Sequence, residues 1–398
     1  MHLVATIYEP TEAKAIDAIR ALPADHDMVE VRFDAFGGRS AAPFRDVTRK
    51  PIILTNRGGE PIDADFGLID VEYGRKPRDP RRTVLSFHDF ERMPDLRTLI
   101  DAMIAAGCAH TKIAVTPDSL RENEELLAAI RPGLTIIGMG ERGLYSRILA
   151  PFFGSELFFA GNAAPGQLSL DRARAIYGDR RFVSRPAKIF AIAGNPAGHS
   201  LSPSIHNPLF RNNGVSAAYT IASFESFNEI AGALESGRIA GLSITAPFKD
   251  DAFAFAKKTG AGIRRNAEEA QAVNTLVRTK SGVIAENTDV MGFERLIPPS
   301  KRAAVVGAGG TARAALVALR RAGIEAVVFN RTPKSGARPL SDLPKFDGDL
   351  VIDTLPSDVR IELPRDVPVI AAAYDRGGLQ LLHEQALPQN ELFLEAFR

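Results

Sequence analysis

Eight short apolar runs recur along the first half of the chain, from Met1 to about Arg181, and each has the length of a β-strand. They are Leu3–Tyr8, Met28–Asp34, Pro51–Arg57, Gly67–Tyr73, Thr83–Phe90, Thr111–Val115, Leu134–Gly140 and Leu157–Gly161. Helical patterns follow several of them, over Thr11–Ala21, Asp95–Ala106, Asp118–Ile130, Tyr145–Phe153 and Leu170–Tyr177. This alternation predicts an α/β fold in which residues 1–181 form a (β/α)8 TIM barrel.

The connections after the third and fourth runs are unusually short. Only Gly59–Phe66 and Gly74–Arg82 separate these runs from the next ones, which leaves no room for ordinary crossover helices. We therefore expect a barrel whose outer ring of helices is trimmed on this side.

Polar side chains gather where the predicted strands end. Glu30, Arg32 and Asp34 alternate along the second run and are expected to share one face. Further candidates stand in later runs or close behind them: Arg57, Glu72, His88, Lys112, Met139 and Arg147. Because a barrel places its reactive groups at the carboxyl ends of its strands, we expect these residues to converge on one pocket. For any single arginine, the alternative is an ordinary surface ion pair.

Lys112 carries the most specific chemistry of this set. It precedes the apolar residues Ile113, Ala114 and Val115, so we expect apolar surroundings that disfavour the ammonium form. Neighbouring Arg and His charges would lower the pKa of this lysine further. A free amine at neutral pH is the nucleophile that attack on a carbonyl carbon requires.

Five segments of this half resemble type I 3-dehydroquinate dehydratase and occur in that family's order. They are Glu30–Asp34, Asp70–Glu72, Ser86–Phe90, Lys112–Ala114 and Ala164–Gln167. The resemblance implies that Lys112 forms a Schiff base with the ketone of 3-dehydroquinate, that His88 moves the proton, and that Glu72 orients the His88 ring. It also implies a lid that carries Gln167 and a substrate-binding set of Glu30, Arg32, Arg57, Met139, Arg147 and Gln167. The chain departs from the family at Ala163, where a serine is usual.

The second half begins after a charged linker, Gly178–Ala187. Its predicted strands are Ile189–Ala193, Ala218–Ile221, Gly241–Thr245 and Thr275–Arg278. Its predicted helices are Ser204–Asn212, Phe227–Glu235 and Asp250–Lys257, with a last helix over about Leu379–Phe397. The loop Gly194–Asn207, between the first strand and the first helix, is crowded with hydroxyl groups and small residues that suit a polar ligand.

Three further loop residues form a plausible set for one hydroxylated ligand. Lys249 closes the segment Ser243–Lys249, and Asn274 and Asp289 follow in later loops. A lysine and an aspartate in one cleft can move a proton to or from an alcohol. Taken singly, each of these residues is more often an ordinary polar loop residue with no part in ligand binding.

A glycine-rich turn follows the buried strand Ala303–Val306. The turn, Gly307–Gly310, leads into a helix that starts with small residues, which suits a pyrophosphate at a helix N-terminus. By itself this run also fits a simple tight turn. The next strand, Ala326–Phe329, is followed by an asparagine and Arg331 where NAD-binding proteins place an acidic residue. A cation there favours a 2′-phosphate, and hence NADP over NAD.

These stretches together resemble shikimate dehydrogenase. The resemblance implies that Lys249 and Asp289 manage the proton while hydride passes to or from the nicotinamide. It implies a shikimate-binding set of Ser200, Ser202, Thr245, Asn274, Tyr374 and Gln385. It implies an NADP(H)-binding set of Gly307, Ala308, Gly309, Gly310, Thr311, Ala312, Asn330, Arg331 and Thr332.

The resemblance also divides the second half into two domains. We expect residues 188–295 with 377–398 to form the shikimate-binding domain, and residues 300–376 to form a Rossmann-like NADP-binding domain. Two departures stand out: Ser243 replaces a frequent asparagine, and only Asp375–Gly377 separates Tyr374 from the segment Gly378–Leu382, where the family has a further helix and strand in between. The nucleotide domain is therefore predicted to be trimmed.

Composition narrows the function classes. The 398 residues carry 49 Lys and Arg against 48 Asp and Glu, a net charge of +1, which gives no field for a polyanion. We expect small-molecule substrates, with no nucleic acid, membrane or metal. The single cysteine, Cys108, excludes an intrachain disulfide and favours a reducing cytosol. A first strand that starts beside Met1 leaves no room for a signal peptide, so a cytoplasmic location is expected.

The two halves agree chemically, because the product of the first reaction is the substrate of the second. We predict a bifunctional enzyme that dehydrates 3-dehydroquinate to 3-dehydroshikimate and reduces this to shikimate with NADPH, for aromatic amino-acid synthesis. Two alternatives stay open: a quinate/shikimate oxidoreductase that uses NAD, and a protein in which one half is a non-catalytic ligand-binding domain.

Overall fold

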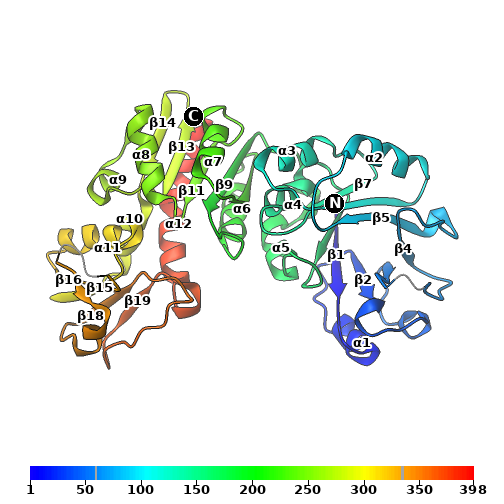
Figure 1. Ribbon diagram of the computed structural model, residues 1–398, viewed down its shortest axis with the longest axis horizontal. Helices are drawn as coiled ribbons and strands as arrows, with labels where there is room; N and C mark the ends of the chain where they lie inside the picture. Colours follow the sequence, from blue (N-terminus) through cyan, green and yellow to red (C-terminus); the bar gives the residue numbers. More distant parts are fainter. Residues whose placement is uncertain (59–60, 333–335) are drawn as a thin grey trace. The chain divides into compact units, whose positions relative to one another are not determined.

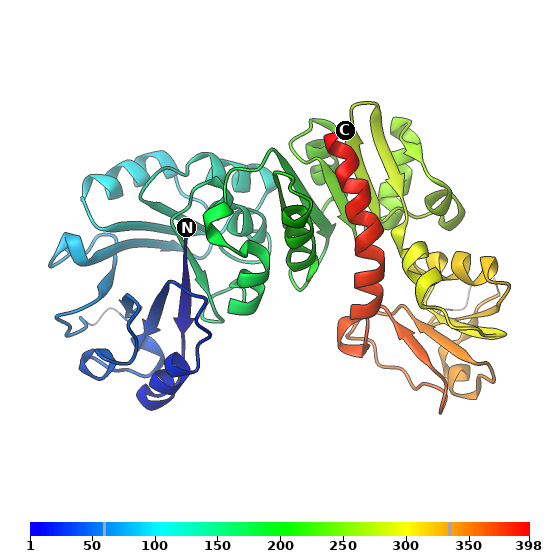
Figure 2. The same ribbon diagram turned by 180° about the vertical axis from the view of Figure 1, so that it is seen from behind.

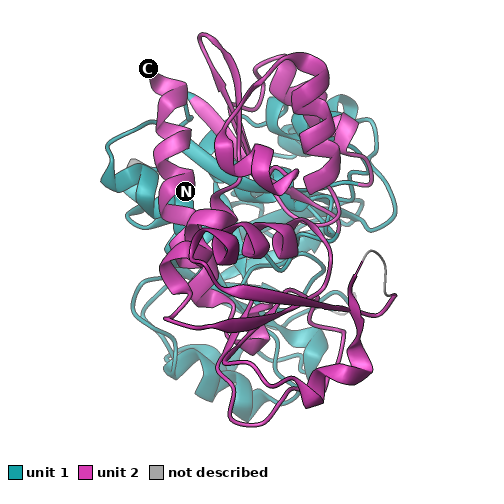
Figure 3. Cartoon of the chain, turned by 90° about the vertical axis from the view of Figure 1, so that its left-hand side faces the viewer, with its two compact units in different colours: residues 1–187, 196–224 teal, residues 188–195, 225–398 magenta. Residues whose placement is uncertain are grey.

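The computed structural model describes residues 1–58, 61–332 and 336–398. The chain divides into two compact units, residues 1–187 with 196–224, and residues 188–195 with 225–398 (Figure 3). None of the helices in the described ranges combines the length and apolar character that crossing a membrane requires.

The first unit contains the predicted barrel (Figure 1). Its eight parallel strands are β1 (His2–Ile7), β2 (Met28–Arg32), β3 (Ile52–Thr55), β4 (Leu68–Glu72), β5 (Thr83–Asp89), β6 (His110–Val115), β7 (Leu134–Gly138) and β8 (Leu157–Ala160). They lie in the order β7-β6-β5-β4-β3-β2-β1-β8. The strands that were expected from the apolar runs are therefore confirmed, with ends that differ by one or two residues.

The two end strands of this order, β7 and β8, are joined by side-chain hydrogen bonds. Leu157 N donates to Thr135 Oγ1 at 3.0 Å, and Ile136 N donates to Ser155 Oγ at 3.1 Å. Glu156 N also donates to the Leu134 carbonyl oxygen at 3.2 Å. The barrel is thus nearly closed, and buried hydroxyl groups satisfy backbone groups along its seam.

The helices around the barrel are α1 (Glu12–Arg20), α2 (Leu96–Ala105), α3 (Leu120–Ala128), α4 (Leu144–Leu149) and α5 (Leu170–Tyr177). Side chains of Thr11, Asp95, Ser119 and Ser169 cap four of them by accepting hydrogen bonds from the first turn. Within the described ranges the connections from β3 to β4 and from β4 to β5 carry no α-helix, as predicted, and the connection from β2 to β3, for which no such prediction was made, also carries only short 3-10 turns. Of the connection Gly59–Phe66, residues 59 and 60 lie outside the described ranges.

One sequence prediction about the second strand was wrong. Strand β2 ends at Arg32, and Asp34 lies in a 3-10 turn, Phe33–Ala35, so the alternation that places Glu30 and Arg32 does not extend to Asp34. The buried Phe33, which belongs to the apolar cluster outside the barrel, accompanies this turn. The Asp34 side chain nevertheless contacts Arg32, whose Nε and Nη2 donate hydrogen bonds to the two Asp34 carboxylate oxygens at 3.0 and 2.7 Å.

Residues 196–224 pack on the barrel as part of the same unit. They form α6 (Ser202–Asn212) and β10 (Ala217–Ser223), which contact α5 and α4 respectively. Arg211 donates to the carbonyl oxygens of Ala175 and Ile176 at the end of α5. Thr220 Oγ1 donates to the Tyr145 carbonyl oxygen at 3.0 Å.

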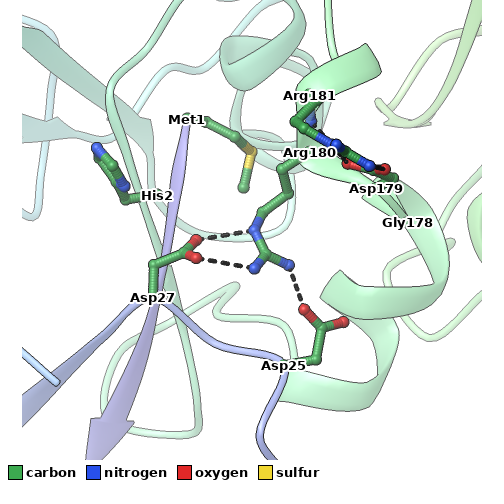
Figure 4. A pocket seen from close by; sticks show the side chains of 8 residues that line it. All are labelled: Met1, His2, Asp25, Asp27, Gly178, Asp179, Arg180 and Arg181. Atoms are coloured by element: carbon green, nitrogen blue, oxygen red, sulfur yellow. Dashed lines mark hydrogen bonds and ion pairs between the residues drawn. The ribbon is translucent and has the colours of Figure 1, made fainter. Parts of the chain in front are cut away.

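A pocket of about 720 Å³ lies at the amino-terminal end of β1 and β2 (Figure 4). Arg180, from the linker, bridges Asp25 and Asp27, with shortest N–O distances of 2.7 and 2.8 Å. Arg181 pairs with Asp179 two residues away. The ion pairs of Arg180 with Asp25 and Asp27 therefore hold the linker against the barrel.

The second unit contains a mixed sheet in which β9, β11, β13, β14 and β12 are neighbours in that order. The strands are β9 (Lys188–Gly194), β11 (Gly241–Ile244), β12 (Gly262–Ile263), β13 (Thr275–Thr279) and β14 (Gly282–Glu286). β13 is antiparallel to both β11 and β14. The helices α7 (Phe227–Glu235), α8 (Lys249–Thr259) and α9 (Arg265–Ala270) accompany this sheet.

The same unit holds a parallel Rossmann-like sheet of order β17-β16-β15-β18-β19. Its strands are β15 (Arg302–Val306), β16 (Glu325–Asn330), β17 (Arg338–Pro339), β18 (Leu350–Asp353) and β19 (Val369–Ala371). The helices are α10 (Thr288–Leu296), α11 (Gly310–Arg321) and α12 (Leu379–Leu394). Figure 2 shows α12 as the long red helix, and it packs against α10.

Candidate active sites

The polar residues at the carboxyl ends of the barrel strands meet in one pocket, as predicted. Its lining includes Glu30, Arg32, Arg57, His88, Lys112, Met139, Arg147 and Gln167. Met139 and Phe159, which both line this pocket, also belong to the apolar cluster inside the barrel. The apolar cluster inside the barrel therefore forms part of the pocket wall, beside the polar groups.

Lys112 lies at the centre of this pocket with only 5% of its surface exposed. Its Nζ is 3.4 Å from Asp70 Oδ2 and 3.9 Å from Glu30 Oε1, and it stands 4.1 Å from the centre of the Phe159 ring. Burial lowers the pKa of Lys112, and the two carboxylates oppose this only in part. The free amine is thus more accessible than in an exposed lysine.

The surroundings of Lys112 differ from the apolar ones that its sequence neighbours indicated. The neighbours Ile113 and Val115 point to the outer apolar cluster, while Lys112 points inward toward two carboxylates. Burial by itself raises the pKa of Asp70, but Lys112 and Arg57 more than offset this and lower it to about 2. Asp70 therefore stays ionised beside the amine.

Asp70 is a site residue that the sequence reasoning missed. It shares one face of β4 with Glu72, because the two residues are separated by one position on a strand. Ser86 Oγ donates to Asp70 Oδ1 at 2.6 Å, which fixes the carboxylate. The alternation along Asp70-Val71-Glu72 would have placed Asp70 on the same face as Glu72, but its contact with Lys112 depends on the neighbouring strands.

His88 and Glu72 form a bonded pair at the ends of β5 and β4. His88 Nδ1 lies 2.9 Å from Glu72 Oε2, and His88 N donates to Glu72 Oε1 at 2.9 Å. Burial lowers the pKa of His88, and its hydrogen bond to Glu72 opposes that effect in part. The ring is therefore neutral at pH 7, with its other nitrogen available to exchange a proton.

The three predicted substrate-binding arginines have different surroundings. Arg57 donates two hydrogen bonds to Asp70, at 2.9 and 2.8 Å, and one to Glu72 at 3.0 Å. Arg32 is paired with Asp34. Arg147 is buried and donates to the Pro165 carbonyl oxygen at 3.1 Å, and burial lowers its pKa to about 10. Arg32 and Arg57 therefore each form an ion pair with a carboxylate, whereas Arg147 forms none with the carboxylates in the described ranges.

The segment that the resemblance identifies as a lid lines the same pocket through Ala163, Ala164 and Gln167. Gln167 Nε2 donates to Thr6 Oγ1 at 3.0 Å, and Ala163 N donates to Gln167 Oε1 at 2.7 Å. Thr6 Oγ1 in turn donates to Glu30 Oε2 at 2.8 Å. A Cβ on Gly166 would come within 2.6 Å of the Gly140 carbonyl oxygen, so only glycine permits this close approach.

The second unit brings Lys249 and Asp289 together, as predicted. Lys249 Nζ donates to Asp289 Oδ2 and, at 2.7 Å, to Thr311 Oγ1. Asp289 is buried and Lys249 is half-buried. A Cβ on Gly310 would lie 3.0 Å from Lys249 Cβ, so a glycine at this position lets Lys249 come close to the glycine turn Gly307–Gly310. The lysine–aspartate pair therefore stands directly beside the start of α11.

Asn274 joins this pair to helix α12. Its Nδ2 donates to Asp289 Oδ1 at 2.9 Å, to Thr288 Oγ1 at 3.0 Å and to Gln385 Oε1 at 3.2 Å. Asn274, Asp289 and Gln385 thus form one bonded set, which the sequence motifs placed far apart along the chain.

Gln389, one turn further along α12, supports this set and was not predicted. Ser243 Oγ donates to Gln389 Oε1 at 2.7 Å, and Gln389 Nε2 donates to Thr275 Oγ1 at 2.7 Å and to the Asn274 carbonyl oxygen at 3.3 Å. Ser243 is buried, and its hydroxyl serves this internal network. A glutamine in a helix carries no sequence signal for such a role.

The remaining predicted shikimate-binding residues lie in both units. Ser200 and Ser202 belong to the first unit, where Ser200 Oγ donates to Ser202 Oγ at 3.1 Å and both are buried. Thr245 and Tyr374 belong to the second unit and are half-buried.

A pocket of about 470 Å³ lies beside the glycine turn and β16. Its lining includes Gly307, Ala308, Ala312, Asn330 and Arg338. Gly307 has φ +108°, and a Cβ there would come within 2.5 Å of Thr354 Oγ1. Gly309 caps the N-terminus of α11, whose first-turn N–H groups suit a phosphate.

The end of β16 carries the other predicted nucleotide-binding residues. Arg331 and Thr332 are exposed, and Arg331 N donates to Asn330 Oδ1 at 3.0 Å. This geometry fits a dinucleotide with its pyrophosphate on α11 and its adenosine ribose beside Asn330.

Comparison with known families finds two matches along the chain. Residues 3–181 match the type I 3-dehydroquinase family, and residues 192–276 match the shikimate dehydrogenase substrate binding domain. The chain is 27% identical over 383 residues to the shikimate biosynthesis protein AroDE of Chlamydia pneumoniae, which covers 84% of this chain and 78% of that one.

A second relative is the chloroplastic bifunctional 3-dehydroquinate dehydratase/shikimate dehydrogenase of Arabidopsis thaliana. It is 29% identical over 325 residues, which is 72% of this chain and 52% of the relative. This chain thus spans about half the length of the plant protein.

Two solved structures are similar to parts or all of the chain. Shikimate 5-dehydrogenase from Thermus thermophilus, in complex with NADP(H) and shikimate, is 27% identical with a TM-score of 0.45, covering 52% of this chain and 93% of that one. Dehydroquinate dehydratase and shikimate dehydrogenase from S. pombe AroM is 19% identical with a TM-score of 0.39, covering 100% of this chain and 98% of that one.

Proposed function

We propose that this chain, a type I 3-dehydroquinase joined to a shikimate dehydrogenase, works through Lys112 in its barrel and through Lys249 and Asp289 in its second half. The barrel converts 3-dehydroquinate to 3-dehydroshikimate, and the second half reduces 3-dehydroshikimate to shikimate with NADPH. The observation that carries this proposal is the burial of Lys112 in one pocket with His88, whose ring nitrogen Nδ1 lies 2.9 Å from Glu72 Oε2.

In the barrel, the Lys112 amine attacks the substrate ketone and loses water to form an imine. The imine acidifies the neighbouring C–H bond, and neutral His88 removes that proton. His88 then returns a proton to the departing hydroxyl, which leaves as water. Water finally hydrolyses the imine and frees Lys112, so the overall change is the loss of one water molecule.

The carboxylates around Lys112 stabilise the positive charge that the imine carries when protonated. Asp70 and Glu30 lie 3.4 and 3.9 Å from Nζ, and Asp70 stays ionised. Arg147, buried and without an ion pair to the carboxylates in the described ranges, is the proposed partner of the substrate carboxylate. Arg32 and Arg57 hold hydroxyl groups of the substrate, and Gln167 with its lid excludes water.

In the second half, Asn274, Thr245, Gln385, Tyr374, Ser200 and Ser202 are the proposed shikimate-binding residues. Lys249 donates a proton to the developing alkoxide as the ketone is reduced, and Asp289 holds Lys249 in place. Asn274 orients Asp289 through its 2.9 Å hydrogen bond.

The glycine turn and β16 fit a nicotinamide dinucleotide. When bound, that group supplies the hydride for the reduction. Gly307, Ala308, Gly309, Gly310, Thr311 and Ala312 would hold its phosphates. Asn330, Arg331 and Thr332 would hold the adenosine ribose with its 2′-phosphate, because no acidic side chain closes β16.

A coupled assay with the full chain tests both halves. Incubation with 3-dehydroquinate and NADPH is expected to yield shikimate, seen by chromatography, with a matching loss of NADPH absorbance. A preference for quinate with NAD in the reverse direction would replace the proposed substrate and cofactor.

Borohydride trapping tests the barrel chemistry separately. Reduction in the presence of 3-dehydroquinate is expected to leave a covalent mass adduct on a peptide that contains Lys112. The absence of an adduct under conditions that support turnover would refute the imine.

A further inference from the structure

The loop from Pro196 to Ser202 carries the two proposed shikimate-binding serines but is anchored by residues of the barrel. Ser200 N donates to the Ala197 carbonyl oxygen at 2.9 Å, and Ser202 N donates to Ser200 Oγ at 3.2 Å. The position of both hydroxyl groups therefore depends on the backbone at Ala197. This loop and its anchors all lie in the first compact unit.

Glu141, in the loop between β7 and α4, holds that backbone. Its Oε1 accepts hydrogen bonds from Ala197 N at 2.8 Å, from Gly198 N at 2.8 Å and from Ser223 Oγ at 2.7 Å. Three donors thus converge on a single carboxylate oxygen. A neutral or shorter side chain does not reproduce this arrangement, because charge-assisted hydrogen bonds are about twice as strong as neutral ones.

A second barrel residue fixes the other side of the loop. Arg172, on α5, donates from Nη2 to the Ser200 carbonyl oxygen at 2.6 Å. Close packing supports the first anchor as well, because a Cβ on Gly198 would come within 3.2 Å of both the Glu141 side chain and Leu144 Cδ1. The serine loop is therefore held at Ala197, Gly198 and Ser200 by side chains from the dehydratase half.

We propose that Glu141 is a positioning residue for shikimate binding, which sets the loop 196–202 from the barrel side and thereby places Ser200 and Ser202. This inference rests on the proposed role of the two serines. It assigns to the 3-dehydroquinase half a structural part in the affinity of the dehydrogenase half for its substrate. Glu141 does not touch the reacting atoms in this scheme.

The effect is expected in substrate affinity and not in the chemical step. Glu141→Ala removes the acceptor of the Gly198 N–H group and of the Ser223 hydroxyl, and it leaves the Ala197 N–H group only its 3.1 Å bond to Ser223 Oγ. The loop is then expected to sample further conformations. We expect the KM for shikimate to rise about tenfold, the scale of one or two charge-assisted hydrogen bonds. The kcat for shikimate oxidation and the dehydratase kcat/KM are expected to stay within about twofold, because Lys249, Asp289 and the barrel pocket are unchanged.

The test uses steady-state kinetics of both reactions on the full chain. Glu141→Gln keeps an acceptor oxygen without the charge and is expected to recover part of the affinity. Glu125→Ala is the matched control, because Glu125 pairs with Arg121 on its own helix and its loss should leave all constants unchanged. Ala197 N also donates to Ser223 Oγ at 3.1 Å, so the double variant Glu141→Ala/Ser223→Ala removes both acceptors of this N–H group and should raise the shikimate KM further than Glu141→Ala alone.

A separate pair of variants distinguishes the two levels of the proposal. Ser200→Ala and Ser202→Ala are expected to raise the shikimate KM. If they raise it and both Glu141 variants leave it unchanged, the positioning role is refuted while the serine assignment stands. If the serine variants have no effect, the serine assignment and the inference both fall. A loss of dehydratase activity in Glu141→Gln would also refute it, by showing a general folding defect.

Discussion

Glu72 bonds to His88 twice, once to the ring nitrogen Nδ1 and once to the backbone N–H, both at 2.9 Å. One carboxylate therefore fixes both the orientation of the ring and the end of the strand that carries it. Burial lowers the pKa of His88 below its ordinary value of 6.5, and Glu72 opposes this by favouring the charged ring. The proposed base therefore stays neutral to a lower pH than a free histidine does.

Glu72→Gln separates these two effects. We expect the dehydratase kcat to fall by about 10²-fold or more, because the ring loses its fixed orientation. The acid limb of the kcat/KM profile should move to lower pH, because the charge that favoured protonated His88 is gone. Initial rates with 3-dehydroquinate across the acid range check this, and a limb that moves to higher pH would contradict the assignment.

Lys112→Ala is expected to remove the dehydratase activity selectively. The rate should fall by about 10⁴-fold or more, as it does when other enzymes lose a covalent nucleophile. Shikimate oxidation should stay within about twofold, because Lys249 and Asp289 belong to a different site. Lys14→Ala, at an exposed position of α1, is the control. Loss of both activities in Lys112→Ala would show that the two sites are not independent.

Lys249→Ala is expected to give the opposite result. Without the proton donor, the kcat for reduction of 3-dehydroshikimate should fall by about 10²- to 10⁴-fold, while dehydration continues. Asp289→Asn should lower the same rate, because Asp289 is bonded to Lys249. The two rates are measured on the same preparation, and unchanged reduction in Lys249→Ala would refute its role.

Arg331→Ala tests the choice between the two nicotinamide cofactors. The KM for NADPH is expected to rise about tenfold, which corresponds to the loss of one charge-assisted hydrogen bond to the 2′-phosphate. The KM for NADH, which lacks that phosphate, should hardly change. An equal increase for both cofactors would mean that Arg331 supports the fold of the turn after β16.

Arg180→Ala tests the clamp between the linker and the barrel. Arg180 lowers the pKa of Asp25 by hydrogen bonding, and it also outweighs the burial that raises the pKa of Asp27. We expect a loss of about 1 kcal/mol in the free energy of unfolding at pH 7, a modest value because these carboxylates are partly exposed.

The pH dependence of that loss follows from the lowered pKa values. Groups whose pKa is depressed in the folded state contribute stability above their unfolded pKa of 3.8, and this contribution is lost as the pH falls through the folded values. The difference between wild type and Arg180→Ala should therefore shrink below about pH 4. Chemical denaturation at pH 7 and pH 3 measures it, and Arg181→Ala is the control.

The barrel could be predicted from sequence because most of its strands, with the half-buried β4 as an exception, are buried on both faces. Each strand then reads as an apolar run that needs no long-range information. The hairpin of β13 and β14 and the helix α10 were not predicted. Gly292 lies inside α10, where a Cβ would come within 3.0 Å of Leu381 Cδ1 on α12. A glycine is a poor helix former, and the need for it here comes from this close packing with a residue about ninety positions further along the chain.

The site could be predicted where chemistry and strand alternation coincide. Lys112, His88 and Glu72 combine reactive side chains with strand-end positions, and the structure brings them together. Asp70 and Gln389 were missed because their roles depend on neighbours from other strands or helices. The ion pairs of Arg57 with Asp70 and Glu72 likewise follow from how β3 and β4 lie side by side.

The anchoring of the serine loop by Glu141 and Arg172 bears on how such a fused gene can evolve. Splitting the reading frame at the boundary between the two families would leave α6 and β10 with the dehydrogenase product, stripped of the surface that α4 and α5 provide. If Glu141 and Arg172 position the serine loop as proposed, the separated half is expected to bind shikimate more weakly until other side chains hold Ala197, Gly198 and Ser200. Under this proposal, separating the two halves carries a cost in substrate affinity at these few positions, which would favour keeping them on one polypeptide.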